Sequence, residues 1–252
     1  MSNLFWLSEA QMARLRPYFP KSHGRPRVDD RRVLSGIIFI NRNGLRWCDA
    51  PSEYGPPKTL YNRWKRWSDM GVFARIMEGL AAEGTERKTI MIDATYLKAH
   101  RTASSLRLKK GGGGRLIGRT KGGMNTKLHA ITDSIGRPIR FFITAGQVSD
   151  YTGARALMDS LPSADWLLGD RGYDADWFRE DLANKGITPC IPGRKSRDKP
   201  GRYDKRRYKR RSRIEIMFGR LKDWRRVATR YDRCPKVFLS TIALAATILF
   251  WL

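Results

Sequence analysis

The chain has 252 residues, carries a formal net charge of +26 and has an isoelectric point near 10.7. It is long enough to bury a sizeable core in one large domain or two. The charge predicts a polyanionic partner, nucleic acid above all. A protein that binds membranes or nothing specific is disfavoured, because the basic residues alternate with Tyr and Trp and form no tail. The cysteines, Cys48, Cys190 and Cys234, are too far apart for a paired zinc or disulfide spacing, which suits a reducing cytosol.

Neither end of the sequence predicts a membrane protein. Met1–Trp6 is too short for a signal peptide and lacks its charged start. The apolar segment Val237–Leu252 is short for a membrane span and is interrupted by Ser240 and Thr241. We expect this segment to be a buried helix of the core, with a peripheral membrane segment as the alternative.

The first third of the chain has helical patterns. Ser8 and Gln11 form a capping box, so a helix is expected to begin there. Asp29 or Asp30 is expected to cap a second, deeply buried helix, which breaks at Asn43-Gly44.

A third helix is expected after the tight turn Tyr54–Pro57, capped by Thr59 and running to about Ser68, and a fourth over Val72–Ala82. A short polar helix after a tight turn in an all-helical segment is typical of helix-turn-helix DNA recognition. The alternative is an ordinary helical bundle whose basic face is only solvated. The polar residues of the third helix that would reach base edges are Asn62, Arg63, Lys65 and Arg66.

The charged linker Glu83–Lys88 predicts a domain boundary, with a helical DNA-binding domain over residues 1–86 and a second domain over 87–252. After the linker the pattern becomes extended, and Thr89–Asp93 is a run of β-forming residues that ends in an acid. A carboxylate at the end of a buried strand is a frequent part of a metal site. The alternative is an aspartate that caps the following turn.

A loop rich in Gly, Lys and Arg over residues 102–124 is expected to be mobile and to become ordered on nucleic acid. Its glycines match a phosphate-binding loop in part, but Arg119 replaces the lysine and no strand precedes it, so we attribute the match to chance. A β-hairpin over residues 125–145 follows, with Lys127 and His129 on one face of its first arm. A half-buried strand position is the alternative for His129.

The segment after the hairpin mixes helices and strands. Asp150 is expected to cap a helix. Trp166–Asp170 is a second apolar strand that ends in an acid. A helix capped by Asp174 or Asp176 and a short strand over residues 188–191 follow.

The segment Tyr208–Tyr231 is expected to form a basic helix, since steps of three, four and seven residues return to one helical face. For Glu215 the functional interpretation is a carboxylate directed at a metal ion, and the alternative is a surface acid that relieves repulsion among cations. A neighbouring apolar stripe is expected to pack inward. The residues on the polar stripe are Tyr208, Arg211, Glu215 and Lys222.

Three acids, Asp93, Asp170 and Glu215, can meet on a mixed sheet flanked by helices. Such a set can hold two magnesium ions about 4 Å apart, one activating a water or a 3′ hydroxyl and the other stabilising the leaving oxygen. Oxygen-only ligands favour Mg²⁺ or Mn²⁺ over zinc. The residues alone predict a metal-dependent enzyme that acts on nucleic acid, and leave open a transposase, a Holliday-junction resolvase or another nuclease. A phosphate-loop ATPase is a weaker alternative.

Several stretches of the sequence are similar to the insertion-sequence-five family of bacterial DDE transposases, and the similarity covers almost the whole chain. Tyr208, Arg211, Glu215 and Lys222 have the order and spacing of the family's Tyr-Arg-Glu-Lys signature. The other matching stretches are WCDAPSEYGPPKTLYNRWKRW, IDATYLKAH, the Gly-rich loop, TKLHAITD and GDRGYDA.

The resemblance implies an α/β fold, a ribonuclease-H-like mixed sheet flanked by helices, preceded by the small all-helical domain. It implies Asp93, Asp170 and Glu215 as the metal-binding triad, with two Mg²⁺ ions that Mn²⁺ can replace. We expect no large insertion domain between Asp170 and Glu215. The residues that match the family and are expected to contact DNA are Lys127, His129, Arg171, Tyr208, Arg211 and Lys222.

The resemblance also implies a reaction and its partners. The enzyme would bind the ends of its insertion sequence, cleave phosphodiester bonds there and join the 3′ ends to target DNA. Its partners would be double-stranded DNA and further copies of the chain, in a homodimer or higher oligomer, with no membrane. The expected location is the bacterial cytoplasm, at the nucleoid. The alternative is a transposase-derived DNA-binding protein that has lost catalysis.

Overall fold

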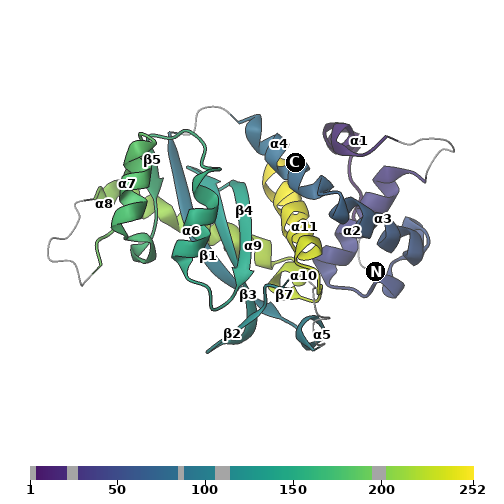
Figure 1. Ribbon diagram of the computed structural model, residues 1–252. Coiled ribbons are helices and arrows are strands. Elements are labelled where there is room, and N and C mark those ends of the chain that lie inside the picture. The colour runs from purple at the N-terminus through teal and green to yellow at the C-terminus, as the bar shows by residue number, and fades with distance from the viewer. Residues whose placement is uncertain (1–3, 22–27, 85–87, 106–113, 195–202) are drawn as a thin grey trace.

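The protein is elongated, with helices from the N-terminal third at one end and a sheet at the other (Figure 1). Its computed structural model describes residues 4–21, 28–84, 88–105, 114–194 and 203–252. Helix α11 (Pro235–Ala246), from the end of the chain, lies between these two parts. No helix in the described ranges has the length and apolar character needed to cross a membrane.

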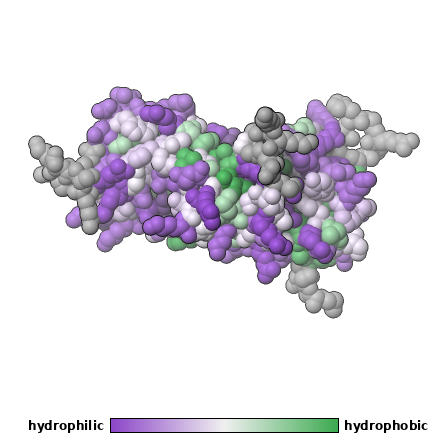
Figure 2. Space-filling view, turned by 60° about the horizontal axis from the view of Figure 1, so that its bottom comes forward, coloured by the Kyte–Doolittle hydropathy of each residue, from purple (hydrophilic) through white to green (hydrophobic). Residues whose placement is uncertain are grey.

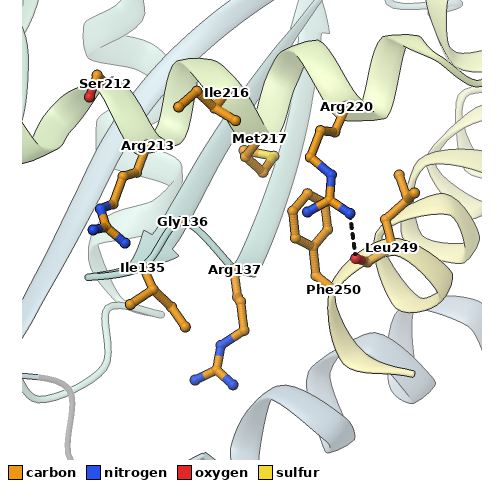
Figure 3. Close-up of a pocket in the computed structure, with 10 residues that line it drawn as sticks. All are labelled: Ile135, Gly136, Arg137, Ser212, Arg213, Ile216, Met217, Arg220, Leu249 and Phe250. Carbon is orange, nitrogen blue, oxygen red and sulfur yellow. Dashed lines mark hydrogen bonds between the residues drawn. The ribbon is translucent and has the colours of Figure 1, made fainter.

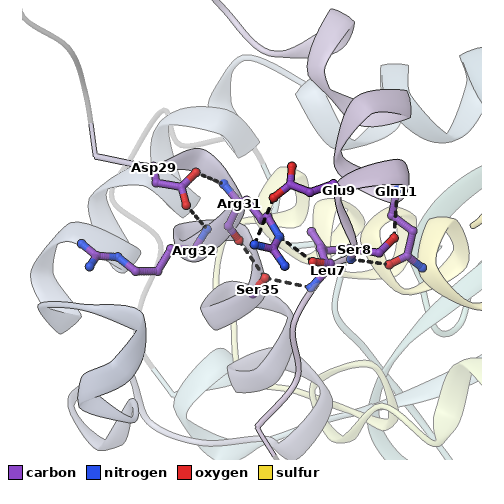
Figure 4. Close-up of polar contacts among 8 residues, drawn as sticks. All are labelled: Leu7, Ser8, Glu9, Gln11, Asp29, Arg31, Arg32 and Ser35. Carbon is purple, nitrogen blue, oxygen red and sulfur yellow. Dashed lines mark hydrogen bonds and ion pairs between the residues drawn. The ribbon is translucent and has the colours of Figure 1, made fainter.

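The described residues of the N-terminal third form four α-helices, and the caps of the first two helices follow local rules. Ser8 accepts from the Gln11 backbone at 3.1 Å while the Gln11 side chain accepts from the Ser8 backbone at 2.9 Å, which confirms the capping box (Figure 4). Asp29 caps the second helix by accepting from the backbone of Arg31, and Ser35 accepts from Leu7 at 3.1 Å. The helices are α1 (Glu9–Leu15), α2 (Asp30–Asn43), α3 (Pro57–Asp69) and α4 (Val72–Ala82), with short 3₁₀ turns η1 (Arg16–Tyr18), η2 (Trp47–Asp49) and η3 (Ser52–Tyr54).

The prediction that Thr59 caps the third helix is wrong. Helix α3 begins at Pro57, two residues earlier, and no side chain caps it. Proline has a fixed φ suited to the first helical turn and lacks the N–H that would need a cap there, so it can open the helix itself. Trp64 and Trp67 then point into the core.

In the described part of the chain, seven strands form one mixed sheet. Its path runs β2-β3-β1-β5-β6, with β4 paired to β3 and β7 paired to β1. Strands β3 and β1 are antiparallel, whereas β5 and β7 run parallel to β1. The strands are β1 (Thr89–Ala99), β2 (Gly118–Thr120), β3 (Gly123–Asp133), β4 (Pro138–Ala145), β5 (Trp166–Leu168), β6 (Thr188–Cys190) and β7 (Thr229–Arg230).

The two faces of the sheet have separate cores. Along β1, Ile90 and Ile92 pack with α6 (Asp150–Met158) and α7 (Asp176–Asn184), while Met91 faces the core shared with α9 (Ser212–Lys222) and α11. Successive strand residues point to opposite faces, so Asp93 lies on the same face as Met91.

The core on the α9 side also reaches the N-terminal helices. It joins residues of α1 to α4 with residues of α9, α11 and the sheet in one apolar cluster. The C-terminal segment is therefore a buried helix, as predicted, and it continues into a π-helical turn, η6 (Thr247–Trp251). The boundary predicted at residue 86 falls at residues 85–87, outside the described residues, and the apolar core continues across it.

Four further predictions of local structure need correction. Strand β1 continues six residues beyond Asp93, so this acid lies inside the strand and caps no turn. Ser149 takes the cap position of α6 that Asp150 was expected to fill. Ala175 precedes α7, and Asp174 pairs with Arg179 at 2.8 Å instead.

The fourth correction concerns the basic segment, which is broken into several short helices rather than one. These are α8 (Lys205–Tyr208), η5 (Lys209–Arg211), α9 and α10 (Arg225–Ala228). Of the Gly-rich loop, residues 106–113, including Gly113, lie outside the described residues. The flanks of that stretch contain α5 (Arg101–Ser104) and β2.

Candidate active site

The pairing of β1 with β5 brings two of the predicted acids together. Met91 pairs with Leu168 in parallel register. Asp93 and Asp170 each lie two residues beyond that pair, so the register places them at the same level of the sheet. Asp170 follows β5 directly and opens the short turn η4 (Arg171–Tyr173), where its side chain accepts from the Gly172 backbone at 2.7 Å.

Asp93 is largely buried, with 14% of its side chain exposed. One carboxylate oxygen accepts from the Ala94 backbone at 2.8 Å, and the other accepts from Arg211 Nη1 at 2.7 Å. Burial raises the pKa of Asp93 to about 6, and the negative charge of Asp170 adds to this, although the Ala94 N–H and Arg211 act in the opposite direction. A carboxyl group with this pKa titrates just below neutral pH.

Glu215 reaches the same place from α9. Arg211, one turn earlier on the same face, donates from Nη2 to Glu215 Oε1 while its Nη1 holds Asp93. One guanidinium therefore joins an acid on the sheet to an acid on the helix. The expected apolar stripe is confirmed, and it packs inward through Ile214, Met217, Phe218 and Leu221.

The residues present fit a divalent cation, although Arg211 holds the position between two of the acids. Among the described residues, no group of three or more His, Cys, Asp or Glu side chains is arranged to hold a metal ion, and the Arg211 guanidinium bonds to both Asp93 and Glu215. The donor set contains only carboxylate oxygens, which suits Mg²⁺ or Mn²⁺.

Lys222 completes the polar face of α9. Its Nζ donates to Thr95 Oγ1 at 2.8 Å, two residues beyond Asp93 on β1. Burial lowers the pKa of Lys222. Tyr208 lies near Arg211, whose Cζ is 5.8 Å from its ring centroid. Arg211 and Lys222 thus both contact β1, through Asp93 and Thr95, whereas Tyr208 lies earlier, on α8.

Lys127 and His129 have structural partners. Lys127 Nζ donates to the Val148 carbonyl at 2.6 Å and to Asp150 Oδ1 at 3.0 Å, and only 6% of its side chain is exposed. His129 has no exposed surface and contacts Thr144 Oγ1 at 3.0 Å; burial lowers its pKa to about 4. A direct DNA contact by His129 does not fit this burial. Arg171, in contrast, is exposed beside Asp170.

The four polar residues of α3 differ in their exposure and in their ion pairs. Arg63 pairs with Asp30 at 2.6 Å and lies over the Trp67 ring, and Lys65 pairs with Asp69 at 2.6 Å. Asn62 and Arg66 are exposed. The exposed pair is better placed than the other two to reach a base edge.

Two residues beside the acids, Asp150 and Tyr173, were not predicted as parts of a site. Gly172 has Asp170 Oδ1 2.8 Å and Asp150 Oδ2 3.6 Å from the position that a Cβ would take. Asp150 is thus a fourth acid at this place. The adjacent Tyr173 hydroxyl is buried and has no hydrogen-bond partner among the described residues, which costs about 1–3 kcal/mol. Tyr173 lies within the GDRGYDA stretch, whereas Asp150, after the hairpin, was interpreted only as a helix cap.

Helix α9 also borders a groove of about 550 Å³, between it, the β3–β4 turn and η6 (Figure 3). The polar side chains drawn there include Arg213, Arg137 and Arg220, and Arg220 Nη2 donates to the Leu249 carbonyl at 3.2 Å. None of the ten described lining residues is an acid, so this groove is distinct from the acidic centre. Elsewhere on the surface, Figure 2 shows hydrophilic residues at both ends of the elongated molecule and a hydrophobic area near its middle.

Comparison with known protein families identifies the family of this chain. The family described as "Transposase DDE domain" matches residues 84–250, which include all three acids. The chain belongs to the DDE transposase family. A second family, described as "Putative transposase of IS4/5 family", matches residues 7–77. The resemblance to insertion-sequence transposases is thereby confirmed, and the protein is a DNA transposase; membership of the DDE family implies a divalent metal ion in general.

Two relatives are named as transposases of insertion sequences. The "Putative transposase for insertion sequence element IS6501" of Brucella ovis is 36% identical over 130 residues, covering 51% of this chain and 99% of the relative. The "Putative transposase for insertion sequence element IS402" of Burkholderia cepacia is 28% identical over 156 residues, covering 54% of this chain and 72% of the relative.

A solved structure supports the fold. The piggyBac transposase, in a synaptic complex with hairpin DNA, superposes with a TM-score of 0.50 at 10% identity, covering 97% of this chain and 72% of that one. Together with the mixed sheet and its flanking helices, this confirms the ribonuclease-H-like α/β fold that the sequence predicted.

Proposed function

We propose that Asp93, Asp170 and Glu215 form the catalytic centre of this transposase, with two Mg²⁺ ions that Mn²⁺ can replace. The observation that carries the proposal is the meeting of three elements: Asp93 on β1 lies level with Asp170 after β5, and Arg211 joins Asp93 to Glu215 on α9. When bound, the ions would activate the attacking water or hydroxyl and stabilise the leaving oxygen.

Arg211 and Lys222 bind DNA phosphates in this proposal. Without DNA, Arg211 forms ion pairs with both Asp93 and Glu215. A guanidinium forms bidentate hydrogen bonds with a phosphate as readily as with a carboxylate, so an incoming DNA backbone competes for it. Binding of DNA would therefore draw Arg211 away and leave the carboxylates free for ions. Lys222, beside Thr95, would contact a neighbouring phosphate.

The reaction is cleavage at the ends of the insertion sequence and joining of the 3′ ends to target DNA. In this proposal residues 1–86 recognise the ends through the exposed Asn62 and Arg66 of α3, and residues 87–252 carry the chemistry. Arg171 and Tyr208 lie near the acids and would contact the backbone. The protein acts as a homodimer or higher oligomer on double-stranded DNA at the bacterial nucleoid.

Acid-to-amide variants test the centre. Asp93→Asn, Asp170→Asn and Glu215→Gln should each lower cleavage of a labelled end duplex in Mg²⁺ by about a thousandfold, equal to about 4 kcal/mol of activation free energy. DNA binding should persist in all three, and Ca²⁺ should support binding without cleavage. The matched control is Glu180→Gln, an exposed acid on α7, which should cleave normally. Normal cleavage by Glu215→Gln would remove that residue from the centre.

A further inference from the structure

The most unusual polar group outside the three acids is the hydroxyl of Tyr173. The side chain is 1% exposed, and its oxygen has no hydrogen-bond partner among the described residues. Its ring is held in the core beside α7, where its centroid lies 6.1 Å from that of Phe178. Packing alone would be served as well by phenylalanine, so the buried hydroxyl needs another explanation.

The surroundings of this hydroxyl are acidic. Burial raises the pKa of Tyr173 well above its usual value, and the negative charges of Asp150, Asp93 and Asp170 act in the same direction. The group therefore keeps its proton and is a hydrogen-bond donor at every physiological pH. A donor that is influenced by three carboxylates and has no partner among the described residues is suited to a partner that arrives with a ligand.

Asp150 is held so that one of its oxygens faces the centre. Its Oδ1 accepts from Lys127 Nζ at 3.0 Å, and Lys127 is fixed in turn by the Val148 carbonyl. Its Oδ2 and Asp170 Oδ1 lie 3.6 Å and 2.8 Å from the same point, the position that a Cβ on Gly172 would take. That point is kept open by the absence of a side chain on Gly172.

We infer that Tyr173 and Asp150 form an outer layer of the metal centre, in which they position Asp170 and the hydration shell of its divalent ion. The Tyr173 hydroxyl donates a hydrogen bond, and Asp150 Oδ2 accepts one from the water of that shell. Lys127, predicted as a DNA contact, serves here to orient Asp150. The inference rests on the proposed centre at Asp93 and Asp170. Tyr173 and Asp150 are both positioning residues in this scheme.

Mn²⁺ binding to the full chain with end DNA bound tests this layer, measured by the loss of the free-ion electron paramagnetic resonance signal beyond the loss that the same DNA causes alone. Tyr173→Phe and Asp150→Asn should each weaken Mn²⁺ binding by about tenfold or more, as is usual for outer-layer residues. Tyr173→Phe should also raise the melting temperature of the metal-free protein by about 2–4 °C, because it removes an unpaired buried group. A purely structural tyrosine would lose stability instead.

The matched control is Tyr151→Phe, which removes a neighbouring hydroxyl that donates to the Asp174 carbonyl at 3.3 Å and should leave Mn²⁺ affinity unchanged. Asp93→Asn should abolish binding. If Asp93→Asn does so while Tyr173→Phe and Asp150→Asn bind like the unchanged protein, the outer layer is refuted and the proposed centre stands. If Asp93→Asn also binds normally, the proposed centre itself fails.

Discussion

Arg211 and Lys65 were both predicted from the sequence to contact DNA from a basic helix, but their side chains occupy different environments. Arg211 has 16% of its side chain exposed and pairs with Asp93, of which 14% is exposed. Lys65 pairs with Asp69 one turn away on α3, and these side chains are 42% and 50% exposed. A buried acid needs a counter-charge, whereas a surface pair is screened by water. Arg211 is therefore part of the largely buried polar group around Asp93, and Lys65 is a surface residue.

The largest expected difference is in stability. Arg211→Ala should lower the free energy of unfolding at neutral pH by about 3 kcal/mol, because it leaves Asp93 buried without its partner. Lys65→Ala should lower it by less than about 0.5 kcal/mol, as is usual for exposed pairs one helical turn apart. Urea unfolding of both variants provides the measurement. Equal effects would mean that burial does not distinguish the two pairs.

A second prediction uses the titration of Asp93. Burial raises its folded pKa to about 6, against about 3.9 in an unfolded chain, so the folded state binds more protons between these values. The contribution of Asp93 to stability is therefore complete below the unfolded pKa and is lost as the pH rises through 6, by about 3 kcal/mol in total.

Asp93→Asn provides the test of this titration. The Asn side chain does not titrate, so the unfolding free energy of the variant minus that of the unchanged protein should increase from pH 4 to pH 7. A difference that is constant across this range would show that Asp93 has an ordinary pKa.

The smallest expected effects separate phosphate contacts from base contacts. Lys222→Ala should weaken binding to end and scrambled duplexes equally and lower the salt dependence by about one phosphate contact. Arg66→Ala should lower only the preference for the end sequence, by about 1 kcal/mol. Titrations of both duplexes with the full chain at two salt concentrations measure this. If Arg66→Ala leaves the preference unchanged, α3 does not read the ends.

Local rules predicted most of the elements but not the details of the site. The capping box at Ser8 and the strand before Asp170 depend on neighbours in sequence, and both were found where expected. The proposed grouping of Asp93, Asp170 and Glu215 came from their positions after strands and on a helical stripe, and from the spacing of the family motif. The extension of β1 beyond Asp93 could not be read from the sequence, because it depends on pairing with β3 up to Lys98.

The partners of the acids could not be predicted from local sequence patterns either. The bridge from Arg211 to Asp93 joins residues 118 positions apart, and Lys127 reaches Asp150 across 23 positions. Such contacts follow from strand register and helix placement, which no local pattern specifies. Lys127 and His129 therefore resembled DNA contacts in the sequence, while the structure buries both.

The measurement that tests the central claim most directly is iron-mediated cleavage of the protein itself. Fe²⁺ takes the place of Mg²⁺ in oxygen-ligand sites, and with ascorbate and peroxide it generates radicals that cut the nearest backbone. With end DNA bound, the full chain should be cut near Asp93, Asp170 and Glu215, and excess Mg²⁺ should suppress all three cuts. Cuts confined to other segments, or cuts at only one of these positions, would contradict a shared metal centre.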